Sequence, residues 1–244
     1  MNRKKFIRNL GLLGVVLPES ADRALDYLVH DHTHFSGSTI VNAGRSGNNT
    51  RNLLARLDKD CLALRPSLVI LMVGTNDMNS RNHVPLAEYE VNLLKIADQI
   101  KDSGSKLLIL SILPIYIPYL LARHPADFYQ PEGPSVRRTA VNKVIRKVAQ
   151  KEKADFLDIG SIFEKVGKIG THRDSLIQNE INSGKTDGVH PTPNGYRFIG
   201  LALSQFILCN KLPTERIVCF GDSITRGDGS VNKESYPAYL GKLL

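Results

Sequence analysis

The sequence predicts an α/β protein in which five parallel strands form one sheet between layers of helices. Apolar runs of strand length are separated by segments with helical spacing, and they lie at 38–43, 67–73, 106–112, 154–159 and 216–220. Several of these runs are almost free of polar residues, as expected for strands covered on both faces. Strands that alternate with helices favour a parallel sheet with right-handed crossovers.

The helices are predicted from apolar residues that recur every three or four positions. In 50–64 these residues include Leu53, Leu57 and Cys61, and Pro66 stops the segment. The same spacing predicts a short helix at 20–29 and longer helices at 88–103 and 136–152. A closing helix is predicted from Thr192 or Asn194 to Leu208. Residues 114–134 are rich in Pro and Tyr, which predicts a long loop or a broken helix over the functional site.

Length and charge set limits on domain number and partners. The 244 residues suit a single domain over 21–244, because no Pro/Gly/Ser-rich linker divides the chain after residue 20. The formal charge of +8 is spread along the sequence, so a nucleic-acid partner is not expected. The charge would still favour anionic surfaces or acidic polysaccharides.

Residues 1–20 have the order of an export signal, with basic residues first and an apolar run at 10–17 after them. They resemble a twin-arginine leader in which Lys4 replaces the second arginine. We therefore predict export to the periplasm or the extracellular space. The alternative is a cytoplasmic protein that keeps this segment as a basic amphipathic helix. No apolar run reaches the roughly 20 residues of a membrane span, so none is predicted.

Cysteine and histidine spacing predicts neither a metal site nor a bound cofactor. Cys61, Cys209 and Cys219 are far apart in the sequence, and we expect all three to be small buried side chains. His30, His32 and His34 alternate, but no carboxylate or cysteine pattern accompanies them beyond Asp31, so an exposed loop is the favoured interpretation.

Four polar turns lie at or near the ends of predicted strands or in loops. They are Asn-Ala-Gly-Arg-Ser-Gly at 42–47, Gly-Thr-Asn-Asp at 74–77, Asp-Gly-Val-His at 187–190 and Gly-Asp-Ser-Ile-Thr at 221–225. In open parallel sheets the active groups gather beyond the carboxyl ends of the strands, so all four turns would share one edge. A serine at a strand-to-helix turn presents its hydroxyl there, beside helix N–H groups.

Together the four turns resemble the motif blocks of the SGNH (GDSL-like) hydrolase family. The resemblance implies a flavodoxin-like, three-layer α/β/α fold. The order departs from the family, because the Gly-Asp-Ser block usually comes first and here comes last. We interpret this as circular permutation, with the usual termini joined through 210–215. The interpretation predicts a sheet order of 38–43, 216–220, 67–73, 106–112, 154–159.

The resemblance and ester chemistry imply a role for each polar residue. Ser223 would be the nucleophile, His190 its general base, and Asp187 the acceptor that fixes the imidazole tautomer. By resemblance, the oxyanion hole consists of the backbone N–H groups of Ser223 and Gly47 and the side-chain amide of Asn76.

Four neighbouring residues have plainer interpretations. Asp77 is expected to be an ordinary turn former and Asp222 to shape the nucleophile turn. Arg45 and Arg226 are expected to be solvated rather than bound to substrate.

The leading functional hypothesis is a serine esterase that hydrolyses O-acyl esters of small molecules or carbohydrates without a metal. Carbohydrate O-acetyl esters rank first as substrates, and lysophospholipids or other short-chain acyl esters rank second. The competing hypotheses are a non-catalytic carbohydrate-binding protein on the same fold and, on charge alone, a nucleic-acid binder.

Overall fold

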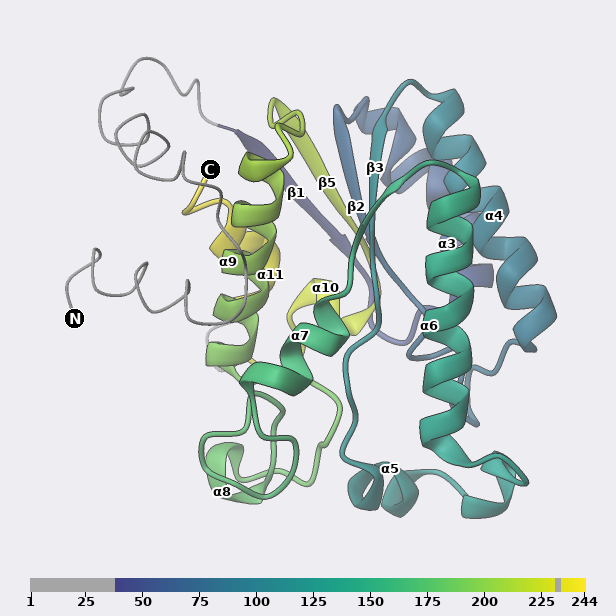
Figure 1. The fold of residues 1–244 in the computed structure, drawn as a ribbon, viewed down its shortest axis with the longest axis vertical. Coiled ribbons are helices and arrows are strands. Elements are labelled where there is room, and N and C mark those ends of the chain that lie inside the picture. Colours follow the sequence, from purple (N-terminus) through teal and green to yellow (C-terminus); the bar gives the residue numbers. More distant parts are fainter. Residues whose placement is uncertain (1–37, 231–233) are drawn as a thin grey trace, which may run out of the picture. The chain divides into compact units, whose positions relative to one another are not determined.

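Five parallel strands form the centre of the computed structural model, which describes residues 38–230 and 234–244 (Figure 1). The strands are β1 (Thr39–Gly44), β2 (Leu68–Met72), β3 (Lys106–Leu110), β4 (Asp155–Leu157) and β5 (Arg216–Gly221). All five predicted strands are present, and their ends differ from the prediction by a residue or two at most.

The last strand in the sequence occupies an interior position in the sheet. The strand order is β1-β5-β2-β3-β4, so β5 is hydrogen-bonded on both sides. Cys219 of β5 is in register with Asn42 of β1 on one side and with Ile70 of β2 on the other. The predicted sheet order is therefore confirmed, whereas circular permutation as its origin stays a prediction.

Alternate residues of the strands face two separate hydrophobic layers. In β5, Val218 and Phe220 pack with helices α3 (Thr50–Asp60), α4 (Leu86–Asp102) and α6 (Gly133–Lys151) (Figure 1). Ile217 and Cys219 pack on the other face with α7 (Ile159–Val166), α9 (Pro193–Cys209) and α11 (Tyr236–Leu240). This period-two division places helices on both faces of the sheet. It gives the expected three-layer arrangement.

The longer predicted helices are all present. They are α3 (Thr50–Asp60), α4 (Leu86–Asp102), α6 (Gly133–Lys151) and α9 (Pro193–Cys209). A 3-10 turn, η2 (Leu62–Leu64), ends the first of them early. Residues 114–134 form the broken helix that was one of the two expectations, with α5 (Ile117–Arg123) and the 3-10 turn η3 (Ala126–Tyr129). The remaining elements are α7 (Ile159–Val166), α8 (Glu180–Ser183), α10 (Ser223–Arg226) and α11 (Tyr236–Leu240).

Helix α7 (Ile159–Val166) was not predicted, and one prediction about burial was wrong. Asp158 caps this helix by accepting a hydrogen bond from the backbone N–H of Ser161. Cys209 is exposed because it is the last residue of α9, whereas Cys61 and Cys219 are buried as expected.

Several other predictions fall outside the described residues. These are the export signal at 1–20, the helix at 20–29 and the His30 to His34 loop. Within 38–230 and 234–244, no helix is both long and apolar enough to cross a bilayer. The same residues contain no group of three or more His, Cys, Asp or Glu side chains placed to hold a metal ion.

Candidate active site

Ser223 begins helix α10 two residues after β5 ends at Gly221. Asp222 caps the helix, because its Oδ1 accepts a hydrogen bond of 2.9 Å from the backbone N–H of Ile224. A Cβ at Gly221 would lie 2.3 Å from Thr225 Oγ1 and 2.4 Å from the Met72 carbonyl oxygen, so only glycine fits. Asp222 thus shapes the turn that leads into Ser223, as expected.

The turn at 187–190 brings His190 against Ser223. Asp187 organises it, because its Oδ1 accepts hydrogen bonds from the backbone N–H groups of Val189 at 2.8 Å and His190 at 2.6 Å. Its Oδ2 lies 2.9 Å from His190 Nδ1, and His190 Nε2 lies 3.0 Å from Ser223 Oγ. Gly188 has a φ of 70°, in the left-handed region that glycine adopts readily. The three side chains therefore form one chain of hydrogen bonds with the predicted connections.

The ionisation of Asp187 and His190 is coupled. Burial alone raises the pKa of Asp187, but the hydrogen bonds and charge of His190 outweigh it and lower the pKa to about 2. Burial alone lowers the pKa of His190, but the hydrogen bond and charge of Asp187 outweigh it and raise the pKa above its usual 6.5. Asp187 is thus ionised at neutral pH and stabilises a protonated imidazole.

The other two motif turns meet the 221–225 turn at the same sheet edge. The backbone N–H of Arg45 donates to the Gly221 carbonyl oxygen at 3.1 Å, and Asn76 Nδ2 donates to the Asn48 carbonyl oxygen at 2.9 Å. Gly47 lies between Arg45 and Asn48 in the sequence and has a φ of 75°. All four predicted turns therefore come together, with the three predicted oxyanion donors on three of them.

Arg56 connects two of these turns to helix α3, a role that was not predicted from the sequence. Its guanidinium donates to the carbonyl oxygens of Ala43 at 2.9 Å and Gly221 at 2.8 Å, and its Nε donates to Asn48 Oδ1 at 2.7 Å. Burial lowers its pKa from the usual value. A signal was available, because Arg56 stands next to Leu57 on the apolar face of the 50–64 segment.

Asp77 is more than the turn former that was expected. Its side chain is buried, and its Oδ1 accepts from the backbone N–H of Thr50 at 2.9 Å and from Thr50 Oγ1 at 2.5 Å. Burial raises its pKa to about 6, although the bonds from Thr50 oppose the increase. Asp77 therefore fixes the start of α3 to the turn that carries Asn76.

Arg45 and Arg226 have exposed side chains, as expected, and both also make ion pairs or hydrogen bonds at the protein surface. Arg45 Nη2 lies 2.7 Å from Asp60 Oδ2. Arg226 Nη1 donates to Ser46 Oγ at 3.0 Å, and Ser46 in turn donates to Asp228. These hydrogen bonds connect Ser46, which precedes Gly47, to α10, the helix that starts at Ser223.

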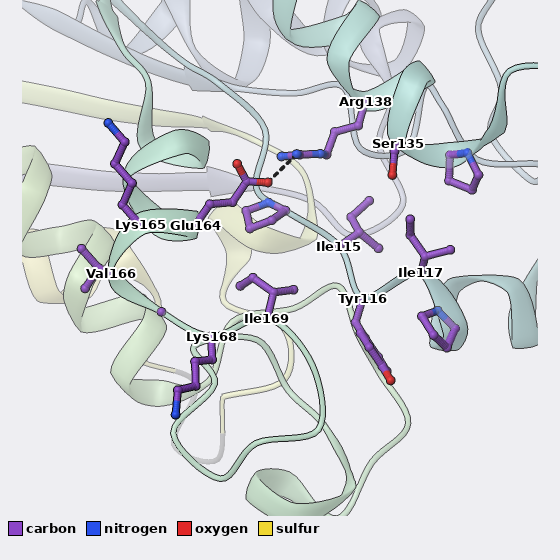
Figure 2. Close-up of a pocket in the computed structure, with 14 residues that line it drawn as sticks. Ile115, Tyr116, Ile117, Ser135, Arg138, Glu164, Lys165, Val166, Lys168 and Ile169 are labelled. Carbon is purple, nitrogen blue, oxygen red and sulfur yellow. Dashed lines mark hydrogen bonds and ion pairs between the residues drawn. The ribbon is translucent and has the colours of Figure 1, made fainter.

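A cavity of about 750 Å³ lies near the 187–190 turn, between residues 114–118, the start of α6 and residues 164–169. Figure 2 shows Ile115 and Ile169 within it, with Arg138 and Glu164 joined above them. That ion pair measures 2.5 Å. Tyr116 connects the cavity to the site, because its backbone N–H donates to the Gly188 carbonyl oxygen at 2.8 Å. The segment 114–118 is thus shared by the cavity wall and the turn that carries His190.

Residues 14–198 match the model of the GDSL-like Lipase/Acylhydrolase family, which is more than half of the chain. The chain belongs to this family. It is accordingly a carboxylic ester hydrolase. The match ends before residues 221–225, so it includes the regions of the other three motif turns but not Ser223.

Two curated relatives are similar to this GDSL-like acylhydrolase over most of its length. An acetylxylan esterase from Geobacillus stearothermophilus is 29% identical over 181 residues, which is 70% of this chain and 73% of the relative. The uncharacterized lipoprotein YqeF of Bacillus subtilis strain 168 is 25% identical over 173 residues, which is 66% of this chain and 70% of the relative.

Solved structures show the same fold. The lipase/acylhydrolase from Enterococcus faecalis superposes with a TM-score of 0.53 at 20% identity, covering 69% of this chain and 74% of that one. The acetyl xylan esterase AlAXEase superposes with a TM-score of 0.54 at 21% identity, covering 68% and 79% of the two chains. At these identities the likeness establishes the fold alone.

Proposed function

We propose that this acylhydrolase is a serine esterase that removes acetyl groups from carbohydrate through Ser223, His190 and Asp187. The observation that carries the proposal is the chain of hydrogen bonds from Asp187 through His190 to Ser223 Oγ, at the edge where Gly47 and Asn76 also lie. The acetylxylan esterase relative supports an acetylated polysaccharide as substrate.

The reaction would proceed in two acyl-transfer steps. Ser223 Oγ attacks the acetyl carbonyl carbon while His190 Nε2 takes the hydroxyl proton. The N–H groups of Ser223 and Gly47 and the Asn76 amide donate to the oxyanion that forms. His190 then gives its proton to the departing sugar oxygen as the C–O bond breaks. Water attacks the acetyl-serine in the second step, with His190 again as the base, and acetate leaves.

The raised pKa of His190 sets the expected pH dependence. The base must be neutral to accept the Ser223 proton, so kcat/KM rises with pH as the imidazolium loses its proton. Because Asp187 raises that pKa above 6.5, the midpoint of the acid limb is expected above pH 6.5. Asp187 itself, with a pKa of about 2, stays ionised throughout this range.

The test is a substrate panel run on the native protein and on Ser223→Ala. The panel contains acetylated xylo-oligosaccharides, nitrophenyl esters of increasing acyl length and lysophosphatidylcholine. We expect acetate release from the sugars, with Ser223→Ala at least about 1000-fold slower. Turnover confined to long acyl chains or lysolipid would replace the substrate assignment, and full activity in Ser223→Ala would refute the mechanism.

Export is a further part of the proposal. It is supported by the basic and apolar order of residues 1–20 and by a relative that is named a lipoprotein. Cell fractionation of the native protein tests it. Recovery of all the protein in the cytoplasm would contradict export.

A further inference from the structure

The turn that carries His190 has more backbone hydrogen bonds to the rest of the protein at its end than at its start. Its later residues are anchored by backbone bonds, since Gly188 N–H donates to Gln178 O at 3.0 Å and Gln178 N–H donates to His190 O at 2.9 Å. The backbone of residues 185–187 makes one hydrogen bond in the described part of the chain. That bond is the 2.5 Å contact from Arg123 Nη2 to the Asp187 carbonyl oxygen.

Arg123 comes from the broken helix over the site. It is the last residue of α5, and its side chain is about one-third exposed. Besides its bond to the Asp187 carbonyl oxygen, its Nη1 lies 4.0 Å from Asp187 Oδ2. The same segment holds the next residue of the turn, because Tyr116 N–H donates to Gly188 O. Residues 116–123 therefore bind the turn at two successive carbonyl groups.

We propose that Arg123 is a positioning residue for ester hydrolysis, which holds Asp187 so that His190 stays aligned with Ser223 and which places a positive charge beside the Asp187 carboxylate. The proposal rests on the proposed function. It assigns a role to α5, an element outside the four motif turns. Small displacements of a base from its nucleophile are costly, and about 1 Å can lower the rate by about 100-fold.

The charge of Arg123 has a consequence that a purely structural contact would lack. Among the described residues, Asp187 itself, Asp222 of the nucleophile turn and Asp228 after α10 act on the imidazole with their negative charge. The guanidinium of Arg123 lies 4.0 Å from the Asp187 carboxylate. A further carboxylate is that of Glu180 in α8, whose Oε2 accepts a hydrogen bond of 3.4 Å from the hydroxyl group of Tyr119 in α5. The three aspartates favour the imidazolium and the guanidinium opposes it. Removal of the guanidinium is therefore expected to shift the acid limb of kcat/KM to higher pH.

Three substitutions separate the tether from the charge. Arg123→Ala removes both, and we expect kcat to fall about 10-fold and the acid limb to rise by about 0.4 pH units. Arg123→Gln retains a neutral donor, so its kcat should lie between those of Ala and Arg while the acid limb shifts as in Ala. Arg123→Lys retains the charge and a donor, so both quantities should return to near the native values.

Lys147→Ala is the control. It removes an exposed cation of α6 that pairs with Glu90 of α4 at 2.5 Å, away from the cavity and the His190 turn, and it should change neither quantity. Circular dichroism at each pH verifies that the variants are folded. Either an unchanged kcat or an unmoved acid limb in Arg123→Ala overturns the proposal.

A second measurement does not require turnover. In Ser223→Ala protein, NMR of the imidazole protons gives the pKa of His190 directly, with and without Arg123→Ala. We expect Arg123→Ala to raise it by about the same 0.4 units. If the native protein hydrolyses no ester on the panel, the proposed function fails, but this titration still decides whether Arg123 acts on His190. An unaltered pKa would refute the role of its charge.

Discussion

Asn76 is held in place at both ends of its side-chain amide. Its Nδ2 donates to the Asn48 carbonyl oxygen at 2.9 Å, and its Oδ1 accepts from Asn79 Nδ2 at 3.1 Å. A primary amide carries two N–H groups, so one is left to donate to a developing oxyanion. An amide plane fixed before substrate arrives needs no reorganisation during the reaction.

Asn76→Ala should therefore slow the chemical steps more than it weakens substrate binding. We expect kcat to fall by about 100- to 1000-fold with KM changed by less than about 3-fold. Steady-state kinetics on nitrophenyl acetate measures both. Asn210→Ala, at the exposed end of α9, is the control and should behave as the native protein does. A change in KM alone would show that Asn76 binds substrate without stabilising the oxyanion.

Asp222 is a buried carboxylate that contributes to the site at a cost in stability. Burial raises its pKa to about 7, and the nearby Asp77 adds to the increase. The same carboxyl group has a pKa near 3.8 in the unfolded chain. Between pH 3.8 and about pH 7 the folded protein therefore binds a proton that the unfolded chain has lost, and the free energy of unfolding decreases as the pH rises through this range. Asn cannot ionise, yet its carbonyl oxygen can still accept from the Ile224 N–H.

Asp222→Asn should therefore be more stable than the native protein at pH 8, with the difference closing towards pH 4. Thermal unfolding followed by circular dichroism across that range measures the difference in melting temperature between the two proteins. A difference that stays the same at every pH would show that the ionisation of Asp222 does not cause it.

The long helices and the strands were predictable because their period is local in the sequence. Helix α7 was missed for a local reason too. The strand β4 passes into the helix through Asp158 alone, and Ile159 continues the apolar run, so the two elements resembled one longer strand. Helix α11 is five residues long, too short for a helical period to emerge.

The candidate site also divides into parts that the sequence predicts and parts that it does not. The meeting of the four turns that carry the candidate residues was predictable, because these turns follow strands or lie in loops and have recognisable motif sequences. Arg123 was not predictable, because its contact with Asp187 spans 64 residues and depends on the course of a broken helix. Contacts of this kind follow from tertiary packing, which single-sequence patterns do not encode.

Close packing between β1 and α10 leaves no room for a side chain at Gly44. A Cβ there would lie 2.2 Å from the backbone nitrogen of Arg226 and 2.7 Å from the Thr225 carbonyl carbon. Both are backbone atoms of α10, the helix that Ser223 starts. A side chain would force the helix away from the strand.

Gly44→Ala is expected to lower the free energy of unfolding by about 2 to 3 kcal/mol and to reduce kcat as Ser223 moves. Urea unfolding and turnover measure the two effects. Gly241→Ala is the control, because a Cβ there makes only contacts of 3.6 Å or more. Equal stability of the two variants would contradict the close packing at Gly44.

At the scale of the whole molecule, the C-terminal end of the chain lies beside the first strand (Figure 1). A Cβ at Gly241 would be 3.7 Å from Ile40 Cδ1, and helix α11 packs on β1. The chain from α9 to β5 is a short surface connection over 210–215. The sheet should therefore tolerate a different chain order, since its contacts depend on positions in space.

A rearranged chain should accordingly fold. It would run 214–244, a flexible linker of about six residues, and then 38–213. The control is the chain 38–244 in its native order. We expect the melting temperature of the rearranged chain to lie within about 5 °C of the control, and its kcat/KM within about 3-fold. An unfolded or inactive rearranged chain beside a folded 38–244 control would contradict the permutation interpretation.

The interior position of β5 also affects how the protein is made. As the ribosome extends the chain, β1 and β2 emerge early, yet neither can complete its pairing before β5 emerges after all the other strands. The nascent sheet therefore carries open edges on β1 and β2 until β5 emerges, a state that invites pairing with other chains. Folding of this sheet has to wait for the translation of β5, so chaperones that shield exposed strands would matter more for it than for a sheet whose interior strands are made first.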